Sequence, residues 1–127
     1  MLITNLLTLT LTAYCHCKGC CGKAGQPTAS GRMPLPERTV ALPRAFPLGS
    51  AVLIPALAVA SKGRLDANGG CNLLKQQAIN GYYTFVGEDR LARRYDNRID
   101  IFMGSHKEAV KFGIKTNVTV KIISVSK

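Results

Sequence analysis

The sequence predicts a mainly β domain, a small barrel of short strands with one short helix. The chain has 127 residues, of which 46% are hydrophobic and 19% are charged, and this length and composition fit one globular domain with a single core. Apolar and polar residues alternate with a period of two over several short segments, which is the pattern of half-buried strands. One segment, residues 105–113, carries both a helix start and a helix stop. One short helix among many strands is typical of a small β-barrel.

The first strand is predicted at the N-terminus, where leucine and threonine alternate in "LLTLTLTAY". Leu7, Leu9 and Leu11 would face one side, and Thr8, Thr10 and Thr12 the other. Because no Lys or Arg precedes Lys18, the segment lacks the positive region of a signal peptide. We therefore expect a soluble protein made without a cleaved leader.

Two further strands are predicted after a loop that is rich in Gly, Pro and Ser. The loop spans residues 22–37 and has turn chemistry without periodicity. Strand character resumes over residues 38–55 but is broken at Pro43 and Pro47. Residues 56–80 differ in character, with several glycines and a short helical turn at 72–79. We interpret them as an insertion or lid on a single domain that spans residues 1–127.

The C-terminal half predicts three more strands and the helix. Strand patterns cover residues 81–89, 98–103 and 116–125. Before the last of these, Ser105 is a good N-cap, Glu108 completes a capping box and Gly113 can close the helix. His106 is explained by its place at the start of this helix and not as a catalytic base.

The charge of the chain favours a polyanionic partner. The net charge is +10, from 17 Lys and Arg against 7 Asp and Glu, which suits nucleic acid, an anionic membrane face or an acidic polymer such as a bacterial cell wall. The densest basic cluster is Arg90, Arg93, Arg94 and Arg98. The chain has no Trp, so a base-stacking surface for single-stranded nucleic acid is poorly supplied. The apolar run at residues 48–60 is too short for a membrane span and contains a proline.

Five cysteines leave three chemistries open. Cys15, Cys17, Cys20 and Cys21 lie within "YCHCKGCCG", and Cys71 stands apart in a Gly-rich stretch. Thiolates at this spacing suit a zinc or iron–sulfur site, with His16 as a further ligand. One or two disulfides, with Cys71 as a long-range partner, would need an oxidising compartment. Reduced structural thiols are the third alternative.

Two aspartates stand beside apolar residues. Asp100 interrupts the strand pattern "RIDIF", and Asp89 follows "TFVGE". On a pleated strand Asp100 points away from its two isoleucine neighbours, so it can face a groove while they fill the core. Burial there would raise its pKa, which suits a general acid. The alternative from the residues alone is an ordinary ion pair with Arg98 or Arg94.

Several segments, taken together, resemble the bacterial three-aspartate domain. They are "TAYCHCKGCCG", "TASG" at residues 28–31, "TVALPRAFPLGSAVLIP" and "RIDIFMGSHKEAVKFG", which occur in the family's order. The resemblance covers nearly the whole chain except residues 56–80. This family is similar to the catalytic barrel of membrane-bound lytic transglycosylase A and of spore and resuscitation-type muralytic proteins. The resemblance implies a double-psi β-barrel that cleaves the glycan strands of peptidoglycan without water.

The resemblance also implies roles for individual residues. Asp100 matches the family's third aspartate and would act as the acid/base. Asp89 matches the second and would raise the pKa of Asp100 or stabilise positive charge at the anomeric carbon. The first family aspartate is missing, because Leu42 holds its place. The family's glycine turn has become "DRLARRYD", which adds arginines and Asp96, and we expect Asp96 to be a solvated turn residue.

The sugar-binding residues implied by the resemblance come from two places. Thr28, Ser30 and Gly31 match the family's groove-lining loop, whose hydroxyls can bond sugar groups; an ordinary turn is the alternative. Tyr14 is a candidate for packing on a sugar face, and a core position is the alternative. The chemistry needs no metal and no organic cofactor.

The predicted function is therefore that of a peptidoglycan lytic transglycosylase. It would cleave the bond between N-acetylmuramic acid (MurNAc) and N-acetylglucosamine (GlcNAc), with 1,6-anhydromuramic products, as a phage endolysin or virion-associated lysin at the bacterial cell wall. The expected partner is the glycan strand, without nucleic acid or membrane, and we expect a monomer. One alternative is a non-catalytic barrel that binds cell-wall glycan. A cysteine-rich metal or nucleic-acid module is the other.

Overall fold

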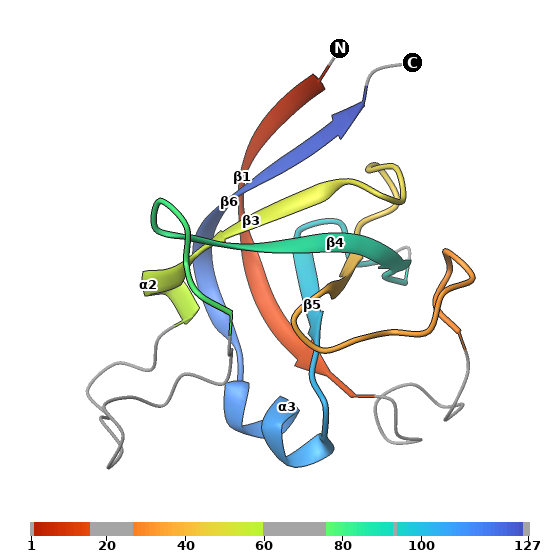
Figure 1. Ribbon diagram of the computed structural model, residues 1–127, viewed down its shortest axis with the longest axis vertical. Coiled ribbons are helices and arrows are strands. Elements are labelled where there is room, and N and C mark those ends of the chain that lie inside the picture. Colours follow the sequence, from red (N-terminus) through yellow and green to blue (C-terminus); the bar gives the residue numbers. More distant parts are fainter. Residues whose placement is uncertain (1, 16–26, 60–75, 93, 126–127) are drawn as a thin grey trace.

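Six strands and two short helices make up the described part of the chain, which comprises residues 2–15, 27–59, 76–92 and 94–125 of the computed structural model (Figure 1). The strands are β1 (Leu2–Tyr14), β2 (Thr39–Leu42), β3 (Ala51–Pro55), β4 (Tyr82–Arg90), β5 (Arg98–Phe102) and β6 (Lys115–Val125). The helices are α2 (Ala56–Val59) and α3 (His106–Phe112). Every strand predicted from the sequence overlaps one of these strands.

The strands form a closed barrel in the order β1-β5-β2-β4-β3-β6. Two pairs, β1 with β5 and β2 with β4, are parallel, and the other four are antiparallel. Each parallel pair joins strands that are not consecutive in the chain, so each needs a crossover connection, as a double-psi barrel does. The predicted small, mainly β barrel is confirmed.

The barrel interior is filled by every second residue of each strand. Leu9 and Leu11 of β1 are buried in the main core, whereas Thr10 and Thr12 lie on the outer side, as the alternation predicted. The fully enclosed side chains include Phe85, Leu11, Leu42, Ile54, Ile99, Ile101 and Ile122. Burial of one such side chain contributes roughly 1.5–3 kcal/mol relative to leaving it exposed, so this interior fixes which residues face outward.

The predicted helix is confirmed as α3, which lies at the end of the barrel opposite the two chain termini (Figure 1). Ser105 is its N-cap, with an extended backbone, and its hydroxyl accepts a hydrogen bond from the Glu108 N–H at 3.2 Å. Gly113 ends the helix with a φ of 74°, a left-handed value that favours glycine. Neither α3 nor α2, the helices of the described residues, is long and apolar enough to cross a membrane.

The prediction of a single helix was wrong, because α2 forms at the start of residues 56–80. Its sequence Ala-Leu-Ala-Val follows Pro55 directly, and alanine and leucine have high helix propensity. A helical turn was also predicted at 72–79. Residues 72–75 lie outside the described part of the chain, and residues 76–79 are not helical. The Gln76 side chain there bonds the backbone N–H and C=O of Thr84, which ties the segment to β4.

Candidate active site

Four residues form a row across four neighbouring strands on the outer face of the barrel. Thr12 of β1 is in register with Asp100 of β5, Asp100 with Ala41 of β2, and Ala41 with Asp89 of β4. Residues in register on adjacent strands point to the same side of a sheet. Both aspartates therefore face the same side, separated by one alanine methyl group. Two strand spacings place their Cα atoms roughly 10 Å apart.

A β-bulge in β4 brings Asp89 to this face. Val40 is in register with Gly87 and Ala41 with Asp89, so Glu88 is an extra residue on β4. Phe85 belongs to the core and Gly87 is buried, and without the bulge the alternation would send Asp89 inward as well. An inserted residue re-aims the side chains that follow it. The sequence signal for this bulge is the glycine inside a strand pattern.

Leu42, at the place of the family's first aspartate, lies in the core and not in the site. Its side chain is fully buried in the main cluster. A Cβ added to Gly87 would lie 2.2 Å from Leu42 Cδ1, so the leucine fills the space that the glycine leaves. The site of this chain is therefore built from two carboxyl groups.

The two aspartates line a cavity of about 270 Å³. Its lining residues are Tyr14, Ala41, Asp89, Arg90, Leu91, Ala92, Tyr95 and Asp100. Tyr14, Ala41, Leu91 and Phe102 form a small apolar cluster, separate from the barrel core, beneath this surface. A larger hollow of about 670 Å³ lies between α2 and β6 but is lined by no carboxyl group. Of these two cavities, the one on the outer face carries the carboxyl groups that acid–base chemistry needs.

Asp100 has the properties of a general acid. Burial raises its pKa to about 6, against the lowering effects of a hydrogen bond from Thr12 and the charge of Arg98, and Asp89 contributes a smaller raising effect. The Thr12 hydroxyl donates to Asp100 Oδ1 at 3.0 Å. Within the described residues Asp100 makes no ion pair with Arg98 or Arg94, so the simple ion-pair alternative does not hold there. Asp100 lines the cavity, so its carboxyl group can meet a ligand there.

Asp89 is held as a hydrogen-bond acceptor by three donors. The Tyr14 hydroxyl donates to Oδ2 at 3.2 Å. The backbone N–H of Ala29 donates to Oδ1 at 3.1 Å, and that of Arg90 at 2.9 Å. The donors come from β1, from the loop before β2 and from β4, so the carboxylate is fixed from three sides.

The structure places the loop that contains Thr28, Ser30 and Gly31 beside Asp89. Thr28 is buried, and its hydroxyl donates to the Arg32 carbonyl at 2.7 Å and lies 2.8 Å from Ser30 Oγ. Gly31 has a φ of 86° and is exposed, as is Ser30. The Thr28 hydroxyl is thus used within the turn, while Ser30 and Gly31 border the solvent near the site.

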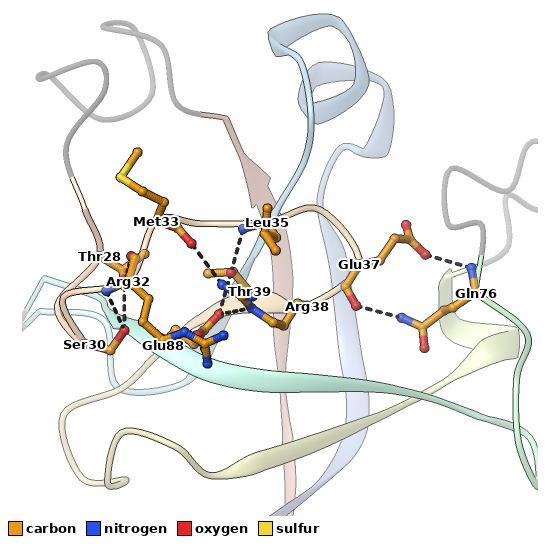
Figure 2. A network of polar contacts seen from close by, with 10 residues as sticks. All are labelled: Thr28, Ser30, Arg32, Met33, Leu35, Glu37, Arg38, Thr39, Gln76 and Glu88. Atoms are coloured by element: carbon orange, nitrogen blue, oxygen red, sulfur yellow. Dashed lines mark hydrogen bonds and ion pairs between the residues drawn. The ribbon is translucent and has the colours of Figure 1, made fainter.

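Glu88 fixes that loop from below, a role that sequence reasoning missed (Figure 2). Its side chain is buried, and Oε1 accepts hydrogen bonds from Arg38 Nε and Thr39 Oγ1, each at 2.7 Å. Oε2 lies 3.1 Å from Arg32 Nη1, an ion pair without hydrogen-bond geometry. The Glu88 carbonyl also accepts from the Ser30 N–H at 2.9 Å. The bulged residue thereby ties the loop to the strand that carries Asp89.

Two tyrosines contribute to the site in different ways. Tyr14 is 8% exposed and its ring forms a T-shaped contact with Phe102, with centroids 5.3 Å apart, while its hydroxyl bonds Asp89 in the site. Tyr95, which sequence reasoning missed, lines the cavity. The guanidinium groups of Arg98 and Arg94 lie over the Tyr95 ring, at 4.4 and 4.8 Å from its centroid. Asp96 is exposed, as expected for a turn residue.

Comparison with solved structures finds a similar barrel in an aspartate-to-alanine variant of the E. coli lytic transglycosylase MltA, in an apo form. The TM-score is 0.50 and the identity 20%, over 82% of this chain and 29% of that chain. The two share a fold. This chain thus corresponds to less than a third of the length of the MltA chain. No family model and no curated protein matches the sequence.

The cysteine predictions concern mostly residues outside the described part of the chain. The residues outside it are Cys17, Cys20, Cys21, Cys71 and His16. Cys15 follows β1 and is buried in the main core, with Sγ 3.8 Å from His106 Nδ1. Among the residues that the structure describes, no group of three or more His, Cys, Asp and Glu side chains could hold a metal ion.

Proposed function

We propose that this protein is a peptidoglycan lytic transglycosylase that cleaves the MurNAc–GlcNAc bond of cell-wall glycan and leaves a 1,6-anhydromuramic end. One observation carries the proposal. A half-buried carboxyl group with a pKa of about 6 lies beside a second carboxylate in a cavity. The similarity of the barrel to that of a lytic transglycosylase supports this choice of reaction.

In the first step Asp100 donates its proton to the glycosidic oxygen. The bond between that oxygen and C1 of MurNAc breaks, and the electron pair leaves with the GlcNAc hydroxyl. Positive charge develops at C1, and the Asp89 carboxylate, fixed by its three donors, stabilises it electrostatically. A fixed carboxylate needs no reorganisation at this moment.

In the second step Asp100, now a carboxylate, removes the proton from the C6 hydroxyl of MurNAc. The oxygen of that hydroxyl attacks C1 and closes the anhydro ring, so no water is consumed and Asp100 regains its proton. A hydrolase needs two carboxyl groups at set separations, one of them to activate water or attack C1. Here the substrate supplies the nucleophile, and one acid/base group suffices.

The proposal predicts that Asp100→Asn lowers the release of soluble fragments from purified cell walls by about 10² to 10⁴. The matched control is Asp96→Asn, which changes an exposed aspartate outside the cavity and should keep full activity. Mass spectrometry should identify anhydromuramic ends, which are lighter than reducing ends by one water. Reducing muramic ends, or an active Asp100→Asn protein, would show that the mechanism is wrong.

The second candidate is a non-catalytic barrel that binds cell-wall glycan. The replacement of the family's first aspartate by the buried Leu42 and the net charge of +10 favour it. In that case the wild-type protein would sediment with insoluble walls and release no soluble fragments.

A further inference from the structure

Two arginines and a tyrosine form a compact cluster at the rim of the cavity. Arg98 lies over the ring of Tyr95 with Cζ 4.4 Å from the centroid, and Arg94 with Cζ at 4.8 Å. We call Arg94, Tyr95 and Arg98 the arginine–tyrosine cluster. An aromatic ring attracts a guanidinium group through its negative face and restricts its orientation, so the two cations are pre-organised.

Neither arginine of this cluster forms an ion pair with a carboxylate among the described residues. The arginine ion pairs found there both involve Glu88, with Arg32 and Arg38 as partners. Asp96 stands between the two arginines in the sequence but makes no ion pair with either. A hydrogen bond and the charge of Arg94, with a smaller contribution from Arg98, also lower the pKa of Tyr95. Two like charges held at one ring repel each other, and an anion between or beside them would relieve that repulsion.

The cluster lies next to the proposed acid. Arg98 and Asp100 are two positions apart on β5, so their side chains leave the same face of the strand, roughly 7 Å apart along it. Tyr95 lines the cavity together with Asp100 and Asp89. An anionic group bound by the cluster would therefore belong to a sugar held in the cavity.

We propose that the arginine–tyrosine cluster is a subsite for a carboxylate carried by the muramic residue of the substrate. This inference rests on the proposed function. Guanidinium groups bind carboxylates through paired, charge-assisted hydrogen bonds. In an intact strand the carboxylates belong to the stem peptide, whereas in a peptide-free strand the lactyl group of MurNAc carries one. GlcNAc carries no carboxylate. Binding at the cluster would therefore select MurNAc as the sugar that supplies C1 of the cleaved bond.

Isothermal titration calorimetry with the inactive Asp100→Asn protein tests the subsite directly. The probes are three tetrasaccharides. The first consists of two GlcNAc–MurNAc units with stem peptides, the second is the same glycan without peptides, and the third is chitotetraose, which is neutral. We expect at least one carboxylate-bearing probe to bind about tenfold or more tightly than chitotetraose. Adding Arg94→Gln and Arg98→Gln should remove that preference. The control adds Lys107→Gln and Lys111→Gln, at two exposed lysines of α3. It removes the same two positive charges and should leave the preference for carboxylate-bearing probes unchanged.

The outcomes separate the subsite from the proposed function. Preference only for the peptide-bearing probe would identify the stem peptide as the source of the carboxylate, and preference only for the peptide-free probe would identify the lactyl group. A preference that survives the arginine changes, or no preference in the parent protein, would overturn the subsite. The proposed function is judged separately, by whether the wild-type protein forms anhydromuramic ends. A carboxylate preference without such ends would retain the subsite and reject the reaction.

Discussion

Asp100 stands between two residues that are fully enclosed in the core, Ile99 and Ile101, and yet remains half-buried on the outer face. Its surroundings disfavour the charged form, because burial removes water from the carboxylate. The largest opposing effect is the hydrogen bond from Thr12. The balance leaves a group that is protonated below about pH 6 and ionised above it, as an acid that must also act as a base requires.

The pKa of Asp100 predicts how activity depends on pH. Only the protonated form can donate, so kcat/KM for cell-wall cleavage should fall about tenfold per pH unit above a midpoint near 6. Thr12→Val removes the hydrogen bond that lowers this pKa, so the descending limb should move to higher pH. Thr10→Val, on the same face of β1, is the control. An unchanged limb in Thr12→Val would contradict the assignment of Asp100 as the acid.

The same pKa predicts how stability depends on pH. The folded pKa of Asp100 lies above its unfolded value of 3.8, so between about pH 4 and 6 the native state holds more protons than the unfolded state. The contribution of this group to stability therefore falls as pH rises through that window. Asp100→Asn cannot ionise, so it avoids this fall in the free energy of unfolding. It should be more stable than wild type above pH 6, by roughly 1–3 kcal/mol. Urea unfolding at two pH values measures this, and a destabilised Asn variant would contradict it.

At the scale of elements, the bulge in β4 decides where two acidic residues point. Glu88 is the inserted residue, and Figure 2 shows its carboxylate bound to Arg32, Arg38 and Thr39. These contacts fix the loop that supplies the Ala29 N–H to Asp89. The bulge follows Gly87, whose missing side chain leaves space for Leu42. The position of Asp89 therefore depends on how β2 packs against β4.

Gly87→Ala tests this coupling. The new Cβ would lie 2.2 Å from Leu42 Cδ1 and 2.8 Å from Cγ, and Leu42 is fully enclosed and cannot move aside. We expect a loss of about 1–3 kcal/mol in the free energy of unfolding and a lower activity, because Asp89 moves with β4. At Gly104 the nearest atom would be 3.5 Å away, so Gly104→Ala should be tolerated. Equal stability of the two variants in urea would refute the coupling.

At the scale of the whole molecule, the net charge of +10 predicts attraction to an anionic polymer. Such attraction between exposed charges is screened by salt. Retention of the Asp100→Asn protein on insoluble walls should therefore fall as NaCl rises from about 0.05 to about 0.5 M, where the screening length is a few ångströms. Lys107→Gln with Lys111→Gln should weaken this dependence. Retention that is independent of salt would mean that general charge has no part in wall binding.

The strands, their inward faces and the helix α3 could be predicted from the sequence, because they follow from local patterns. The alternation of leucine and threonine in β1 fixes its faces, and Ser105 with Gly113 fixes both ends of α3. Sequence reasoning missed α2, although its alanine and leucine residues favour a helix. It failed at Gln76, where hydrogen bonds to the Thr84 backbone tie the segment to β4. The resemblance to the three-aspartate family singled out Asp89 and Asp100 but not what surrounds them.

The sequence by itself determined that this chain forms a small β-barrel and that Asp100 leaves a strand on the side opposite to the core. Only the tertiary structure decided that Thr12, Ala41 and Asp89 stand in register with it. That register depends on parallel pairings between strands distant in the chain, which no local pattern encodes, and on a bulge for which Gly87 is the sequence signal. Burial sets the pKa of Asp100, and burial is a property of the assembled barrel. The sequence therefore singled out the two carboxyl groups, and the fold brought them into one cavity.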